Sequence, residues 1–265
     1  MREDNDVPVV LLHGVGLDRS VWGRVEQRLG RPTVALDLPG HGEQPALTSP
    51  TTLAEMAADV AIRLPAGPVH LVGFSLGALV AQRLTVDQPG RVRSLTCVSS
   101  VAERTDEEAA AVQARLDGAA RDFAGSMSRA LDRWFPAGEA EETAAWREET
   151  RAVLLANDPD SYLHAYAVFA TGDRDIAARL PEISVPTLAI TGEFDPGSTP
   201  EMSRRLARRI PDAEVVIVPD ARHMLPVTHP DDLADRLENL IGHQARNSRS
   251  TSPSSTPSTT ERSRT

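Results

Sequence analysis

The sequence predicts an α/β protein built on a mostly parallel, doubly wound sheet of about six strands. Short apolar runs recur along the 265-residue chain and are bounded by turn residues. They are apolar nearly throughout rather than alternating, as parallel strands covered on both faces require. Segments with helical spacing lie between them, and this repeated strand-helix order is typical of a parallel sheet.

The elements follow in order along the chain. We predict strands at residues 7–12, 33–37, 69–73, 94–100, 186–191 and 214–218. After the third strand, an apolar helical face contains Leu76, Leu79 and Leu84, and Pro89-Gly90 ends that helix. After the fifth strand, Met202, Leu206 and Ile210 repeat the pattern before Pro211.

Two segments depart from this alternation. Residues 101–180 are rich in Ala, Glu and Arg and contain no convincing strand, so we interpret them as an inserted helical lid. The α/β core would then comprise residues 1–100 and 181–245. Residues 246–265 are almost wholly Ser, Thr, Pro and Arg, so they cannot bury apolar surface and are expected to be disordered.

Composition excludes several classes of function. All 28 basic residues are arginine, so the lysine of a Schiff-base enzyme or a P-loop NTPase is absent. A net charge of −10 argues against a nucleic-acid partner. One cysteine, Cys97, allows no intrachain disulfide. The first apolar run is too short for a signal or a membrane span, so we expect a cytoplasmic protein with no membrane partner.

The clearest chemical motif is Gly73-Phe74-Ser75-Leu76-Gly77, which joins the third predicted strand directly to a helix. This is the G-x-S-x-G elbow in the context that it requires. A serine on such a strained turn brings its neighbours two positions away into close approach, where a Cβ would collide. The motif predicts that Ser75 is a nucleophile.

A serine nucleophile needs a base and an acid that orients it, here in the order Ser, Asp or Glu, His. Asp195 follows the fifth predicted strand and His223 the sixth. Both therefore lie where ligands bind in open α/β sheets. Glu193 and Glu103 are alternatives for the acid.

The other histidines fit the role of base less well. They lie at the wrong end of a strand, before the serine, in the predicted lid, near a helix start or beside the tail; they are His70, His41, His164, His229 and His243.

An oxyanion formed by attack of the serine needs two backbone donors. The N–H of Leu76, directly after the nucleophile, would supply one. The second must come from the loop at 13–16 after the first strand, where the N–H of Val15 is the candidate. The alternative is that this loop is a plain turn that ends a strand.

Together these motifs resemble the α/β-hydrolase family. The matching pieces are His-Gly-Val-Gly at 13–16, Asp-Leu-Pro-Gly-His-Gly at 37–42, Gly-Phe-Ser-Leu-Gly at 73–77, Gly-Glu-Phe-Asp at 192–195 and Arg-His at 222–223. Within the family the chain looks most like small bacterial ester and lactone hydrolases related to 3-oxoadipate enol-lactonases. Residues 17–22 and 180–188 support this, although C–C bond hydrolases and cofactor-free haloperoxidase-like members share these pieces.

One departure from the family concerns the start of the sheet. Family members usually begin with a β-hairpin before the oxyanion loop, whereas His13 already belongs to that loop. Either the start is truncated or the sheet has six strands. In the second case residues 33–37 lie near an exposed edge, where a second copy of the chain could pair to give a homodimer.

The resemblance implies an enzyme that cleaves a small carboxylic ester or lactone through an acyl-enzyme, without a metal or organic cofactor. Cleavage of a C–C bond in a diketone, haloperoxidase-like chemistry and a non-catalytic receptor for a small ligand are the alternatives. For substrate contacts we single out Trp22 and Trp134. Arg129 and Arg133, beside Trp134, are the candidates for binding a substrate carboxylate.

Overall fold

The computed structural model describes residues 7–135 and 140–250, with side chains described as far as residue 242. A six-stranded sheet forms the centre of the molecule, and all pairings between its described strands are parallel. Its strands are β1 (Val9–Leu12), β2 (Thr33–Leu36), β3 (Val69–Phe74), β4 (Val92–Val98), β5 (Thr187–Gly192) and β6 (Ala213–Val218). The predicted fold class and number of strands are confirmed.

The order of the strands is β2-β1-β3-β4-β5-β6. The chain therefore moves in one direction from β1 to β2 and then returns past β1 to add the remaining strands on the other side. The loops that leave β1 and β3 diverge at this reversal, and ligands of open α/β sheets bind in the crevice that such a reversal creates. The fold thus brings the loop after β1 next to the loop after β3.

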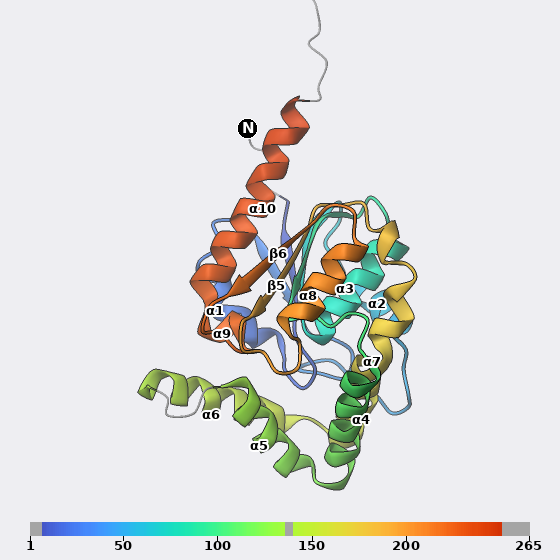
Figure 1. Ribbon diagram of the computed structural model, residues 1–265, viewed down its shortest axis with the longest axis vertical. Coiled ribbons are helices and arrows are strands. Elements are labelled where there is room, and N and C mark those ends of the chain that lie inside the picture. Colours follow the sequence, from blue (N-terminus) through green and yellow to red (C-terminus); the bar gives the residue numbers. More distant parts are fainter. Residues whose placement is uncertain (1–6, 136–139, 251–265) are drawn as a thin grey trace, which may run out of the picture.

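Helices cover both faces of the sheet (Figure 1). On one face α1 (Gly23–Glu26), preceded by the short helix η1 (Arg19–Trp22), packs against α10 (Pro230–Ser250) and α9 (Leu225–Thr228). On the other face lie α2 (Leu53–Arg63), α3 (Leu76–Asp87) and α8 (Pro200–Arg209). Nearly every residue of α3 is buried, so this helix is fixed from all sides.

In the described part of the segment between β4 and β5, the α-helices are α4 (Asp106–Arg121), α5 (Phe123–Trp134), α6 (Glu141–Ala156) and α7 (Pro159–Ala177). In Figure 1, α4, α5 and α6 lie beyond the end of the core toward which the strands point, and we call these three helices the lid. Helix α7 returns from the lid and packs against α2 and α3. The short helix η2 (Leu180–Glu182) then leads into β5.

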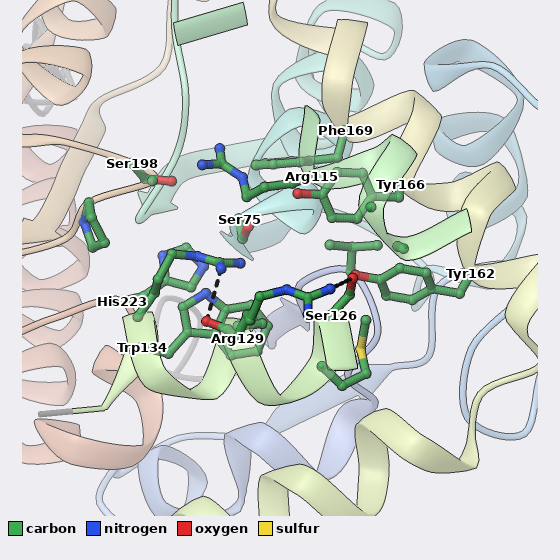
Figure 2. Close-up of a pocket in the computed structure, with 18 of the residues that line it drawn as sticks. Ser75, Arg115, Ser126, Arg129, Trp134, Tyr162, Tyr166, Phe169, Ser198 and His223 are labelled. Carbon is green, nitrogen blue, oxygen red and sulfur yellow. Dashed lines mark hydrogen bonds between the residues drawn. The ribbon is translucent and has the colours of Figure 1, made fainter. Parts of the chain in front are cut away.

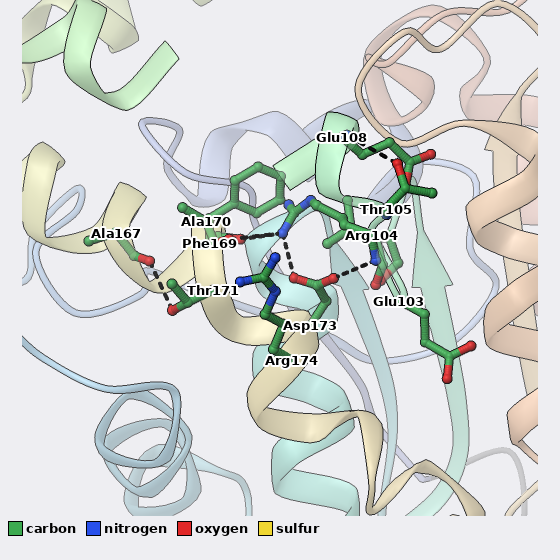
Figure 3. A network of polar contacts seen from close by, with 12 residues as sticks. Glu103, Arg104, Thr105, Glu108, Ala167, Phe169, Ala170, Thr171, Asp173 and Arg174 are labelled. Atoms are coloured by element: carbon green, nitrogen blue, oxygen red, sulfur yellow. Dashed lines mark hydrogen bonds and ion pairs between the residues drawn. The ribbon is translucent and has the colours of Figure 1, made fainter. Parts of the chain in front are cut away.

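A buried ion pair joins α7 to the segment that follows β4 (Figure 3). The Arg104 guanidinium donates to Oδ1 of Asp173 at 2.6 Å, and the Arg104 backbone N–H donates to Oδ2 at 2.9 Å. The same guanidinium donates to the carbonyl of Phe169 and lies over its ring, 4.7 Å from the centroid. These contacts fix the position of α7 relative to the start of the lid segment.

The C-terminal boundary of the folded part differs from the prediction. Helix α10 continues to Ser250, so residues 246–250 are helical and the predicted start of a disordered tail at residue 246 is wrong. A helix that is already nucleated adds one hydrogen bond per residue, and the first proline beyond it is Pro253. Residues 251–265 lie outside the described part of the chain.

Strand β2 is an edge strand of the described sheet, and its pairing with a second copy stays a prediction. Among the helices of residues 7–135 and 140–250, none combines the length and apolar character needed to cross a membrane.

Candidate active site

Ser75 lies at the sharp turn between β3 and α3. Its backbone has φ 54° and ψ −112°, a left-handed φ that a serine seldom adopts. A Cβ on Gly73 would overlap the carbonyl of Gly77, and a Cβ on Gly77 would overlap the carbonyl of Leu12. The two glycines of the motif are therefore required because the strand, the helix and β1 approach one another closely.

Hydrogen bonding and packing hold this strained turn. The Ser75 backbone N–H donates to the carbonyl of Val98 in β4 at 2.9 Å, and the Ser75 carbonyl accepts from Ala78 at 3.0 Å. A residue in a sparsely populated conformation persists only when its surroundings determine it, and such residues cluster at active sites.

The sequence-predicted acid and base lie in contact. His223, in the loop after β6, places Nδ1 2.7 Å from Oδ2 of Asp195, in the loop after β5. The other carboxylate oxygen, Oδ1, accepts from the backbone N–H groups of Gly197 and Ser198, each at 2.9 Å. Both side chains are buried. The carboxylate is thus fixed by its own turn and orients the imidazole.

The two alternative acids have other partners. Glu193 is exposed and accepts from the backbone N–H of Asp220 at 3.2 Å. Glu103 forms an ion pair with Arg209 at 3.5 Å. The geometry therefore favours Asp195 as the partner of His223.

Two aromatic rings pack against the imidazole. The ring of Phe74, next to Ser75, lies 5.0 Å from the His223 ring, and the indole of Trp134 lies 5.4 Å from it at an interplanar angle of 27°. Figure 2 shows Trp134 beside His223, with Ser75 in the same pocket. Because Trp134 belongs to α5, the lid forms part of the wall around the histidine.

The loop after β1 lies against the elbow. A Cβ on Gly14 would come within 3.2 Å of the Ser75 Cβ, and Val15 lines the pocket. Neither the Val15 N–H nor the Leu76 N–H has an acceptor in the described part of the chain. The Leu76 N–H lies in the first turn of α3, so it has no acceptor within the helix. It belongs to the positive, N-terminal end of the helix dipole, which stabilises a nearby negative charge.

Two buried histidines support this loop. Nε2 of His41 accepts from the backbone N–H of Gly16 at 2.9 Å, and Nε2 of His13 accepts from that of Leu38 at 2.9 Å. Burial lowers the pKa of His13 to about 4, and burial together with the neighbouring His13 lowers the pKa of His41 to about 3. Both rings are therefore neutral at pH 7, with Nδ1 donating to a backbone carbonyl.

Ser75 and His223 open into one pocket of about 240 Å³, a size suited to a small molecule. Three residues chosen from the sequence for substrate contact line it, namely Trp134, Arg129 and Arg133.

Trp22 does not line this pocket. It is fully buried and packs edge-on against Phe74, with ring centroids 6.4 Å apart. Sequence reasoning missed Arg115 on α4 and Ser198, which both line the pocket. Ser198 could have been found from its position three residues after Asp195. The sequence gives no signal for Arg115, because the pattern of its helix is typical of a solvent-exposed surface.

The comparisons with known proteins cover nearly the whole described chain. The model of the alpha/beta hydrolase family matches residues 9–236. A curated relative from Acinetobacter baylyi, (E)-2-((N-methylformamido)methylene)succinate hydrolase, is 30% identical over 237 residues, which are 87% of this chain and 89% of the relative. A pimeloyl-[acyl-carrier protein] methyl ester esterase from Chromobacterium violaceum is 33% identical over 250 residues, covering 89% and 95% of the two chains.

Solved structures agree on the fold. The enol-lactonase from Burkholderia xenovorans LB400 superposes with a TM-score of 0.80 at 24% identity, covering 91% of this chain and 94% of the other. This likeness concerns the fold, whereas the family model and the curated relatives extend it to sequence. The resemblance inferred from the motifs is confirmed, and the chain belongs to the alpha/beta hydrolase family.

Proposed function

We propose that this protein is a serine hydrolase that cleaves a small carboxylic ester or lactone through an acyl-enzyme. One observation carries the proposal. Ser75, on its strained turn, shares a pocket with His223, whose Nδ1 lies 2.7 Å from a buried carboxylate of Asp195. The relatives support the reaction class, since they carry the names of a hydrolase and a methyl ester esterase.

The first half of the reaction forms the acyl-enzyme. With its Nδ1–H donated to Asp195, the neutral imidazole of His223 keeps the lone pair of Nε2 free to accept a proton. Oγ of Ser75 attacks the substrate carbonyl while that proton moves to Nε2, and the resulting imidazolium then protonates the departing alcohol oxygen. In a lactone, the departing oxygen stays attached to the acyl group.

The carbonyl oxygen becomes negatively charged during this attack. The N–H groups of Val15 and Leu76 would donate to it, because both belong to segments beside Ser75 and neither has another described acceptor. The loss of one such donor typically costs about 3 kcal/mol of transition-state stabilisation.

The second half of the reaction consumes water. His223 takes a proton from a water molecule, the hydroxyl adds to the acyl carbon, and collapse of the intermediate returns the proton to Oγ of Ser75. The products are a carboxylic acid and the alcohol released earlier, so bonds and protons balance without any further reactant.

Hydrolysis of short p-nitrophenyl esters and of small lactones tests the proposal, with Ser75→Ala as the critical variant. We expect wild-type turnover with an initial burst, and loss of at least a thousandfold in kcat for Ser75→Ala. An organophosphorus reagent should add one covalent group to the wild-type chain, located at Ser75 by peptide mass spectrometry. Ser128→Ala, an exposed serine on α5, is the matched control.

Two outcomes would contradict the proposal. Equal rates for the wild type and Ser75→Ala would show that another group performs the reaction. Tight binding of esters and lactones without turnover or labelling of Ser75 would indicate a receptor on the same fold.

A further inference from the structure

The wall of the active-site pocket carries positive charge without negative charge. Three arginines line it, Arg115 on α4 and Arg129 and Arg133 on α5, and no described lining residue is Asp or Glu. The whole chain has 38 acidic and 28 basic residues, so its composition would favour the opposite sign. The concentration of arginine is a local property of this pocket.

Two of these arginines have no counter-ion in the part of the chain that the structure describes. Arg115 and Arg133 form no ion pair there, and the Arg133 guanidinium donates to the backbone carbonyl of Arg129 at 2.9 Å. Arg129 differs, because it pairs with Asp122 at 3.2 Å and donates to Oγ of Ser126 at 2.6 Å. Arg115 and Arg133 therefore remain able to bind an anion.

The positive charges of Arg115 and Arg133 repel each other. Burial, and after it the charge of Arg115, lowers the pKa of the Arg133 guanidinium. Partly buried like charges without a counter-ion repel, and an anion held between them would relieve that repulsion.

Ser198 adds a hydrogen-bond donor with no partner. It is fully buried, and its Oγ has no hydrogen-bond partner among the described residues. Its backbone is fixed, since its N–H donates to Asp195 and its carbonyl accepts from Thr191. Figure 2 shows the side chains of Ser198 and Arg115 extending into the pocket that contains Ser75. A buried polar group without a partner is uncommon and points to a ligand.

We propose that Arg115 and Arg133 of the lid, together with Ser198 of the loop after β5, form a carboxylate-binding subsite, so that the substrate cleaved at Ser75 also carries a free carboxylate group. The substrate class would be half esters of dicarboxylic acids and lactones with a carboxylate side chain. The inference rests on the proposed function for the cleaved bond, whereas binding of the anion depends only on the pocket.

The chemistry of the subsite fits a carboxylate. A guanidinium presents a planar pair of N–H groups that matches the two oxygens of a carboxylate, and a hydroxyl adds a third donor. Tyr166, Phe169 and Met127 line the same pocket and supply apolar surface, which suits a short hydrocarbon spacer. The donors would hold one end of the substrate while the other end lies at Ser75.

A binding experiment tests the subsite without catalysis. Glutarate is titrated calorimetrically into Ser75→Ala protein, alone and combined with Arg115→Gln or Arg133→Gln. We expect glutarate to bind, dimethyl glutarate to bind at least tenfold more weakly, and either arginine substitution to weaken glutarate binding at least tenfold. Arg121→Gln, an exposed arginine on the same helix as Arg115, is the matched control and should leave binding unchanged.

Several results of this titration would overturn the proposal. They are absence of glutarate binding, equal affinity in the arginine variants and the control, and tighter binding of inorganic phosphate than of glutarate. Variants that lose their thermal unfolding transition are replaced by Arg115→Lys and Arg133→Lys, which keep the charge but lose the planar fork. These should bind glutarate more weakly than the wild-type arginines do, and equal affinity would count against the subsite.

Turnover then separates this inference from the proposed function. With Ser75 intact, monomethyl glutarate should have at least a tenfold higher kcat/KM than dimethyl glutarate, and Arg115→Gln should abolish that preference through KM. Equal hydrolysis of both esters would overturn the subsite and leave the hydrolase intact. Glutarate binding that depends on the arginines, without hydrolysis of either ester, would support the subsite and contradict the hydrolase.

Discussion

The indole of Trp134 stacks over the imidazole of His223, with ring centroids 5.4 Å apart and planes inclined by 27°. The two residues come from different parts of the chain, α5 of the lid and the loop after β6. An aromatic face stabilises a cation above it, so this contact should favour the imidazolium that forms when His223 accepts a proton. In the proposed reaction, the lid would therefore contribute to the chemistry at His223 through Trp134.

Removal of the Trp134 ring should slow the reaction. Trp134→Ala loses a stacking contact worth about 0.5–2 kcal/mol, so we expect kcat/KM for a p-nitrophenyl ester to fall by about 2- to 30-fold. Trp134→Phe keeps an aromatic face and should recover part of the loss. Trp146→Ala is the control, because that indole lies on α6 of the lid and packs with Arg24 of α1 instead of His223; an equal loss there would indicate a general effect of loosening the lid.

The Asp195 carboxylate should determine which nitrogen of His223 carries the proton. Asp195→Asn keeps the size of the side chain, but its amide group can donate to Nδ1 and stabilise the wrong tautomer. We expect kcat to fall by about 10³- to 10⁴-fold with little change in KM. Glu193→Gln, in the exposed part of the same loop, should stay near wild type; a loss as large as that of Asp195→Asn would reopen the choice of acid.

The residues of the candidate active site could be found from the sequence because their signals are local. Gly73 and Gly77, each two positions from Ser75, indicate the sharp turn. The backbone approaches these two positions so closely that only glycine fits. The apolar runs reveal six parallel strands, and Asp195 and His223 follow two of them. A parallel sheet brings the ends of its strands to one edge, so their meeting follows from the strand order.

The substrate pocket could not be predicted in the same way. Arg115 lies on a helix rich in Asp, Glu and Arg, and only the packing of α4 against α5 and α7 brings one side of it to the pocket. For Trp22, position in the sequence suggested a substrate contact that the structure does not show. It follows the oxyanion loop closely in sequence, yet the direction of η1 turns its indole into the core against Phe74.

Acid should destabilise the fold partly through His41. Its pKa is 6.5 in its ordinary state and about 3 when folded, so below pH 6.5 the unfolded chain binds a proton that the folded chain does not. Stability from this group is present above pH 6.5 and is lost as the pH falls toward 3, by about 1.4 kcal/mol per pH unit. His41→Gln removes the titration.

Urea unfolding at pH 7, 6 and 5 measures this effect. The free energy of unfolding of His41→Gln should fall less steeply with decreasing pH than that of the wild type, by about 1 kcal/mol per unit between pH 6 and 5. Parallel curves for the two proteins would mean that folding does not lower the pKa of His41. His13→Gln should flatten the dependence in the same direction, because burial lowers the pKa of His13 to about 4.

The buried pair of Arg104 and Asp173 should be the most sensitive ion pair in the described chain. Its side chains are 2% and 1% exposed, and burial lowers the pKa of the Arg104 guanidinium despite the nearby carboxylate. Asp173→Asn leaves that cation without a counter-ion, so we expect a loss of about 3–5 kcal/mol in the free energy of unfolding. Glu148→Gln, which breaks an exposed pair with Arg151, should cost less than about 1 kcal/mol.

A double variant separates the cost of an unpaired charge from the value of the pair. Replacing both side chains with apolar ones, in Arg104→Met combined with Asp173→Leu, removes the buried cation and should recover part of the stability lost in Asp173→Asn. Recovery should be incomplete, because Arg104 also donates to the carbonyls of Phe169 and Ala170. Since Phe169 lines the active-site pocket, the double variant should also show a raised KM; an unchanged KM would mean that α7 holds the pocket wall without this contact.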